Sequence, residues 1–190
     1  MDNFENLATI SNIFKEMPVK DIEAEARAIA HQNQLTKPPG ALGILEELAI
    51  FLASWQKKTM PSLRAVQALV FAGNHGICDQ GVNPFPQDVT KQMVENFKAG
   101  GAAINQLCEV NGADLKVVPI ALETPTADFT KKEAMSESEL CQAMKIGARS
   151  VNLDSDLILL GEMGIGNSTI SSALAASVFG SSVERWVGAG

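Results

Sequence analysis

The strongest indication of the fold is the segment Leu157-Ile-Leu-Leu-Gly-Glu-Met-Gly-Ile-Gly-Asn-Ser-Thr169. Its first four residues form an apolar run with the length of a buried strand. A loop with glycines at 161, 164 and 166 follows, and residues 170–178 are then typical of a helix with Asn167, Ser168 or Thr169 as its N-cap. A glycine loop before a helix N-terminus predicts a phosphate site, because backbone N–H groups and the helix dipole both favour an anion.

Two nucleotide-binding fingerprints fit this loop only in part. Gly161, Gly166 and Ser168 have the spacing of a P-loop, but Asn167 occupies the position of the P-loop lysine. Gly164-x-Gly166 begins a dinucleotide fingerprint, but Thr169 takes the place of its third glycine. The loop therefore suits the single phosphate of a mononucleotide. The alternative is a strand–turn–helix corner that binds no ligand.

Length and charge narrow the class of protein. A chain of 190 residues with 46% hydrophobic residues predicts one α/β domain with a small appendage. Its formal net charge of −7 argues against nucleic acid or an anionic membrane as partner. The N-terminus lacks the pattern of a signal peptide, and no apolar run approaches the ~20 residues that span a bilayer.

Cysteine and histidine usage predicts a reducing compartment and no metal. Cys78, Cys108 and Cys141 are odd in number and widely spaced, which fits free thiols in the cytoplasm. His31 and His75 are the two histidines, and neither lies in a cluster with ligand spacing. We therefore expect neither a metal site nor a cofactor.

Residues 1–62 are expected to form a helical region. Residues 22–32 are alanine-rich and helix-prone, with Asp21 as a plausible N-cap. Residues 44–55 predict an amphipathic helix whose apolar face consists of Leu45, Leu48, Leu52 and Trp55. This face could pack on the main domain or on a second copy of the molecule.

From Arg64 onward, expected strands alternate with expected helices. The strands are residues 65–72, 115–122, 157–160 and 183–190, and the helices are residues 88–98, 102–110, 136–151 and 170–178. This alternation predicts an α/β fold with a doubly wound, mostly parallel sheet in residues 63–190. Pro119 suggests a sheet edge or a strand end. Because the last expected strand ends in a glycine turn without a following helix, we expect the fold to be C-terminally incomplete.

Several motifs occur together in one order along the chain. They are Lys37-Pro-Pro-Gly-Ala-Leu-Gly43, Asn74-His75-Gly76, Gly81-Val82, Pro86-x-x-Val-Thr90, Gly100-Gly101 and the glycine loop that ends at Thr169. In this order, the motifs resemble those of the nicotinate-nucleotide–dimethylbenzimidazole phosphoribosyltransferases of cobalamin biosynthesis. The resemblance covers nearly the whole chain from about Asp21 onward. The resemblance implies transfer of phosphoribose from nicotinate mononucleotide to 5,6-dimethylbenzimidazole, which gives α-ribazole 5′-phosphate and nicotinate. It also suggests a homodimer.

The resemblance and the residues together suggest site roles. The expected phosphate and nucleotide contacts are Gly164, Ile165, Gly166, Asn167, Ser168 and Thr169, with Gly188 and Gly190 added by the resemblance. Glu162 is expected beside the ribose, where it could stabilise positive charge at the anomeric carbon. Alternatively, it is a loop carboxylate that caps a backbone N–H.

The resemblance places the aromatic base against residues 74–93. It implies that Phe85 and Met93 line the base pocket and that Asn74 and His75 lie at its floor. Phe85 and Met93 could equally be core residues. The family commonly has an acidic residue where this chain has Asn74.

The family's general base is a glutamate in a C-terminal region that has no counterpart in these 190 residues. Since a placed base typically contributes about 10²–10⁴-fold to the rate, we expect this chain alone to be weak or inactive. The alternative is a catalytically inactive chain that only binds a mononucleotide or a benzimidazole.

Overall fold

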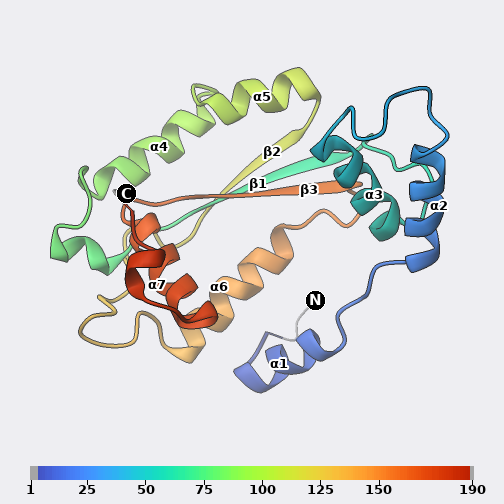
Figure 1. Cartoon of the computed structure of the whole chain (residues 1–190). Helices are drawn as coiled ribbons and strands as arrows, with labels where there is room; N and C mark the ends of the chain where they lie inside the picture. Colours follow the sequence, from blue (N-terminus) through green and yellow to red (C-terminus); the bar gives the residue numbers. More distant parts are fainter. Residues whose placement is uncertain (1–3, 189–190) are drawn as a thin grey trace.

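The computed structural model describes residues 4–188 and contains a parallel sheet with helices on both faces (Figure 1). The strands are β1 (Val66–Ala72), β2 (Asp114–Pro119) and β3 (Leu157–Met163), in the order β2-β1-β3. The expected parallel α/β fold is confirmed. Pro119 is the last residue of an edge strand, where its missing N–H breaks no ladder.

Helices cover the two faces of the β1–β2 pair. On one face, α4 (Asp88–Lys98) and α5 (Ala103–Asn111) contact β2, and α6 (Glu137–Ser150) lies on the other face (Figure 1). The buried Gln67 of β1 holds the end of α6, because its amide donates to Ser150 O at 3.2 Å and accepts from Asn152 N at 2.9 Å. A serine followed three residues later by a glutamate is a capping-box pattern, and Ser136 and Glu139 form this box at the start of α6, each satisfying the other's backbone N–H group.

The N-terminal region consists of α1 (Leu7–Lys15), α2 (Ile22–Gln32) and α3 (Ile44–Gln56). Asp21 caps α2 as predicted, accepting from Ala24 N at 2.8 Å. Helices α2 and α3 pack against each other, and Gln56 at the end of α3 donates to Asp156 O just before β3. A domain boundary at residues 62–63 stays a prediction. None of the helices within residues 4–188 combines the length and apolar character needed to cross a bilayer.

Strand β3 exists where the sequence predicts it, but the expectation that it is buried is wrong. Leu160 is 75% exposed, and Leu159 on the opposite face is exposed as well. The reason is position: β3 is an edge strand of the described sheet, and the covering helices contact the β1–β2 pair instead. The following helix, α7 (Asn167–Phe179), has no buried residue.

The expected strand over residues 183–190 is also wrong within the described chain. The segment instead forms a short 3₁₀ helix, η2 (Val183–Arg185), and folds back on α7. Trp186 stacks on Phe179 with ring centroids 5.6 Å apart, and its indole N–H donates to Gly180 O at 2.8 Å. These contacts hold the segment against α7 and away from the sheet.

Candidate functional site

The carboxyl ends of β1 and β3 meet where the strand order reverses. From β1 the chain passes through η1 (Gly76–Gln80), α4 and α5 to β2, and after α6 it returns to the other edge of β1 as β3. Open α/β sheets bind their ligands at such a switch point. Gly73 N donates to Met163 O at 3.1 Å, so residues 73–76 and 161–169 lie side by side.

Two glycines allow this close approach. A Cβ at position 164 would lie 2.5 Å from Gly73 O and 2.9 Å from the imidazole Nε2 of His75. Gly166 has φ +87°, and a Cβ there would lie 2.9 Å from the Cys78 sulfur. All three distances are shorter than a Cβ atom tolerates, so the backbones of the two loops pack without a side chain at positions 164 and 166.

The amide groups of the glycine loop divide into used and unused donors. Ile165 N donates to Thr90 Oγ1 at 3.1 Å, Asn167 N donates to Gly164 O at 3.1 Å, and Ser168 N donates to Asn167 Oδ1 at 2.8 Å. Within residues 4–188, no hydrogen bond engages the N–H of Gly164 or of Gly166. These two donors, together with the positive end of the α7 dipole, can bind an anion.

The start of α7 differs from the prediction. Asn167, Ser168 or Thr169 was expected as the N-cap, but the helix begins at Asn167 and Gly166 is the N-cap residue. Gly166 takes a left-handed conformation that a side chain would disfavour, and the helix can therefore start directly after the turn. Asn167 is left free to donate from its side chain to the Glu162 carboxylate.

A cavity of about 570 Å³ opens between the carboxyl end of the sheet and α6; we call it the α6 cavity. Its lining brings together three predicted site residues, Asn74, His75 and Glu162, from the ends of β1 and β3. Gln142 and Ile146 of α6 line it from the other side, and Thr126 lines it next to His75. The cavity thus joins a carboxylate, an imidazole and an apolar wall next to the glycine loop.

His75 is suited to contact an uncharged ligand. Burial lowers the pKa of its imidazole, and the negative charge of Glu162 opposes this shift only in part. The imidazole is therefore neutral at pH 7, with one nitrogen as donor and one as acceptor. Its backbone is fixed by the Gln87 side chain, which donates to His75 O.

The other predicted site residues lie elsewhere. Phe85 is 59% exposed in the loop before α4, and Met93 lies on α4, across the sheet from α6; neither lines the α6 cavity. Gly188 is exposed beyond η2, and Gly190 lies outside the described residues. Among residues 4–188, no group of three His, Cys, Asp or Glu side chains could hold a metal ion.

Sequence reasoning missed two supports of the site. Thr90, buried on α4, accepts from Ile165 N, and Gln87 at the start of the same helix holds His75. Both polar residues share a helix face with the buried Val94, at spacings of three and four. A polar residue on the inward face of an amphipathic helix was the available signal, because a buried polar group needs a partner.

Comparison with known proteins agrees with this geometry. The profile of a phosphoribosyltransferase family matches residues 17–190. The chain belongs to the phosphoribosyltransferase family. Nicotinate-nucleotide–dimethylbenzimidazole phosphoribosyltransferase of Rhodobacter capsulatus is 52% identical over 185 residues, which cover 97% of this chain and 55% of the relative. The enzyme of that name from Roseobacter denitrificans is 51% identical over 187 residues, covering 98% of this chain and 56% of the relative.

The fold of the chain is also similar to that of a solved relative. The crystal structure of the phosphoribosyltransferase of the same name from Thermus thermophilus aligns with a TM-score of 0.80 at 36% identity. The alignment covers 88% of this chain and 57% of that one. The chain thus spans about half the length of the relatives that it matches.

Proposed function

We propose that the chain acts in phosphoribosyl transfer from nicotinate mononucleotide to 5,6-dimethylbenzimidazole. In this reaction a base nitrogen attacks the anomeric carbon while the bond from that carbon to nicotinate breaks and nicotinate leaves with the electron pair. The base then loses its N–H proton, and α-ribazole 5′-phosphate results. The observation that carries the proposal is the junction of two unused loop amides with a largely apolar cavity.

The glycine loop is assigned to the 5′-phosphate. The N–H groups of Gly164 and Gly166 would donate to it, and the hydroxyls of Ser168 and Thr169 stand on the first turn of α7. The helix dipole adds to these bonds without a cationic side chain. A monophosphate fits this donor set better than a triphosphate, because the loop offers no lysine and carries Glu162.

The α6 cavity is assigned to the reacting end of the two substrates. Glu162 would lie at the ribose, held by Asn167, where its charge stabilises the positive charge that develops at the anomeric carbon. Asn74 and the neutral His75 would face an uncharged aromatic base. Phe85, Met93, Gly188 and Gly190 enter this proposal through the resemblance alone.

A matched pair of glycine variants tests the phosphate site. Gly166 and Gly112 both have a positive φ, but a Cβ meets the Cys78 sulfur only at position 166 and finds open space at position 112. Gly166→Ala should therefore abolish binding of nicotinate mononucleotide in calorimetry, whereas Gly112→Ala should leave it unchanged. Equal binding by the two variants would overturn the phosphate assignment.

Product analysis tests the reaction itself. Nicotinate mononucleotide and dimethylbenzimidazole are incubated with the purified chain, and α-ribazole 5′-phosphate is sought by chromatography and mass spectrometry. Slow formation of the product is the expected result, and Glu162→Gln should lower its rate more than it lowers substrate binding. Binding of both substrates without product would instead support the alternative of a chain that only binds.

The proposal includes a homodimer in the cytoplasm. Exposed apolar side chains on α3, namely Leu45, Leu48, Phe51 and Trp55, support an interface between two copies. The three free cysteines support a reducing compartment. Leu48→Glu should convert a dimer to a monomer in sedimentation velocity, and a wild-type chain that sediments as a monomer would contradict this part.

A further inference from the structure

The segment that joins β2 to α6 crosses directly over η1. We call residues 121–135 the strap. Thr126 N donates to Asn74 O at 3.1 Å, and Thr126 pairs with His75 in an isolated parallel bridge. A Cβ on Gly76 would lie 2.3 Å from Thr126 O and 2.7 Å from Asp128 N. The backbone of the strap therefore rests on the first residue of η1.

Asp128 fastens the strap to the other end of η1. Its side chain is 6% exposed, and its Oδ2 accepts from the Gln80 amide at 2.6 Å and from the Lys131 ammonium at 3.2 Å. Its Oδ1 accepts from Thr130 N at 2.9 Å and from Thr130 Oγ1 at 2.7 Å. The Gln80 amide, followed by the Thr130 hydroxyl, holds the pKa of Asp128 far below its usual range. The carboxylate is thus charged at every pH near neutrality.

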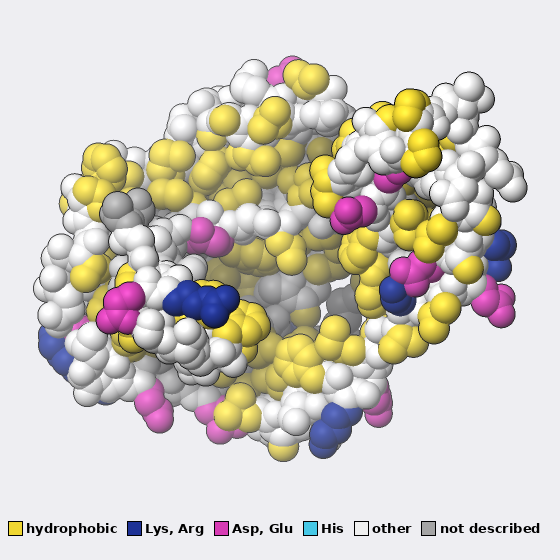
Figure 2. All heavy atoms as spheres, in the orientation of Figure 1, with side chains coloured by type: hydrophobic (Ala, Val, Ile, Leu, Met, Phe, Trp, Pro, Cys, Tyr) yellow, Lys and Arg dark blue, Asp and Glu magenta, His cyan; other side chains and the backbone are white. Residues whose placement is uncertain are grey.

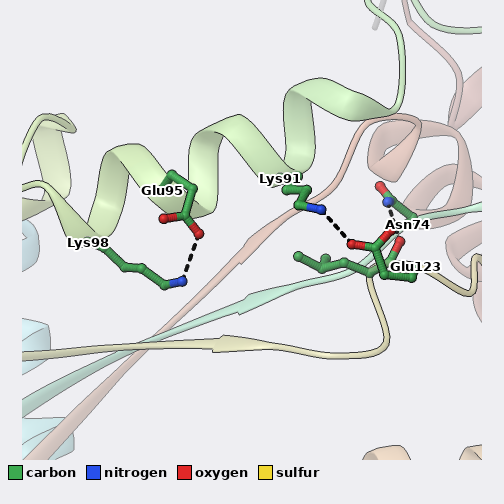
Figure 3. A network of polar contacts seen from close by, with 6 residues as sticks. Asn74, Lys91, Glu95, Lys98 and Glu123 are labelled. Carbon is green, nitrogen blue, oxygen red and sulfur yellow. Dashed lines mark hydrogen bonds and ion pairs between the residues drawn. The ribbon is translucent and has the colours of Figure 1, made fainter.

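The remaining side-chain contacts of the strap are weaker anchors. The Asn74 amide donates to Leu122 O at 2.8 Å, and Lys91 of α4 pairs with Glu123 at 2.7 Å. Figure 3 shows the Lys91 and Glu123 side chains directed at each other. Lys91 and Glu123 are both exposed, and such surface pairs contribute little to stability. Asp128 is therefore the buried, charged residue that holds the strap to η1.

The 3₁₀ helix η1 in turn supports the glycine loop. The thiol of Cys78, in the middle of η1, donates to Ile165 O at 3.1 Å. The glycines on either side of Ile165 pack against the same segment, Gly164 at His75 and Gly166 at Cys78. A displacement of η1 would therefore displace the loop that carries the Gly164 and Gly166 amides.

We propose that Asp128 is a positioning residue for this loop: through Gln80 it holds η1 against residues 164–166 and so fixes the direction of the Gly164 and Gly166 amides. Asp128 itself touches no substrate. The inference rests on the proposed function only where it calls the loop a phosphate site, and the mechanical link can be tested without any nucleotide.

The rate of thiol alkylation measures how firmly Asp128 holds η1 against residues 164–166. Cys78 lies in η1, whereas Cys108 and Cys141 are buried in α5 and α6 and serve as internal references. Each cysteine's rate of reaction with N-ethylmaleimide is followed by peptide mass spectrometry in wild type and in Asp128→Ala. We expect Cys78 to react about tenfold faster, the factor that the loss of one charge-assisted hydrogen bond implies, while the two references keep their rates.

Two other outcomes would overturn the inference. If all three cysteines accelerate equally, Asp128 stabilises the whole fold and has no positioning role. If no rate changes, Asp128 does not hold η1. Gln80→Ala breaks the same bond at an exposed residue without changing the charge, so it should also accelerate Cys78 if the inference holds. Lys131→Ala removes the exposed partner of Asp128 and should leave all three rates within about twofold of wild type.

Calorimetry with nicotinate mononucleotide separates this inference from the proposed function. If both hold, Asp128→Ala and Gln80→Ala weaken binding by about tenfold, and Lys131→Ala does not. If the wild-type chain binds no nucleotide while Cys78 still accelerates selectively, Asp128 positions the loop and the phosphate assignment fails. Unchanged nucleotide affinity in Asp128→Ala, with wild-type binding intact, would overturn the positioning role.

Discussion

The two sides of the central strand β1 differ in how they are covered. On the β2 side, α4 and α5 contact the sheet, and Val118 of β2 is buried. On the β3 side, Leu159 and Leu160 are exposed, and α7 buries none of its residues. Figure 2 shows hydrophobic side chains lining the hollow in the middle of this face.

The comparison shows that an apolar run identifies a strand but does not determine its burial. The central strand β1 is buried along most of its length between β2 and β3, whereas β2 buries only Val118 and β3 buries none of its residues. Covering a strand is a property of the neighbouring elements, which lie far away in the sequence. The candidate site lies between the two sides and depends on both.

The largest expected effect comes from two leucines that are register partners. Leu69 of β1 pairs with Leu160 of β3, but Leu69 is 0% exposed and Leu160 is 75% exposed. We expect Leu69→Ala to lower the free energy of unfolding by about 2–5 kcal/mol and Leu160→Ala to change it by less than about 0.5 kcal/mol in urea titrations. Equal losses would mean that β3 is covered in solution.

The second expected effect compares two glycines near the end of β3. A Cβ at position 161 makes an ordinary contact 3.5 Å from the Val70 side chain, whereas one at position 164 meets Gly73 O at 2.5 Å. Gly161→Ala should therefore stabilise the fold by up to about 1 kcal/mol, and Gly164→Ala should destabilise it by about 1–3 kcal/mol. Thermal unfolding measures both, and a neutral Gly164→Ala would contradict the close packing of the two loops.

The smallest expected effect concerns the start of β3 and depends on pH. The Asp156 carboxylate accepts from Ala65 N, Arg64 N and the Ser62 hydroxyl, and these bonds, Ala65 N first, lower its pKa. Because the folded pKa lies below the unfolded value near 3.9, the stabilisation is full above about pH 4–5 and is lost as the pH falls through the folded pKa.

Asp156→Asn should accordingly be less stable than wild type at pH 7, and the difference should shrink steadily below about pH 4. Denaturant titrations at a series of pH values measure this. The exposed Asp154, two residues earlier, provides the control Asp154→Asn, because its carboxylate accepts none of the three hydrogen bonds that Asp156 accepts. A stability difference that does not depend on pH would show that the carboxylate charge is not involved.

Much of the local structure was predictable. The caps Asp21 and Ser136 act within three residues of their own position, so a short window contains all the information they need. The glycine loop was predictable for the same reason. The N-cap of α7 was not, because the turn that lets Gly166 take this position forms against η1, whose residues are about ninety positions earlier in the chain.

The candidate site was predictable in part. The ends of β1 and β3 were expected to carry it, and Asn74, His75 and Glu162 do line one cavity. Thr90 and the strap were not foreseen, since their contacts with Ile165 and Gln80 join segments far apart in the sequence. The assignments of Phe85, Met93, Gly188 and Gly190 stay predictions.

Neighbouring residues were enough to predict most elements of this protein and its family, because strand length, helix periodicity, caps and ordered motifs are local features of a sequence. The burial of each strand, the loop amides left for an anion and the carboxylate that holds the strap follow from tertiary contacts. Each of these depends on contacts between segments that lie far apart in the sequence, and a linear pattern does not record such contacts.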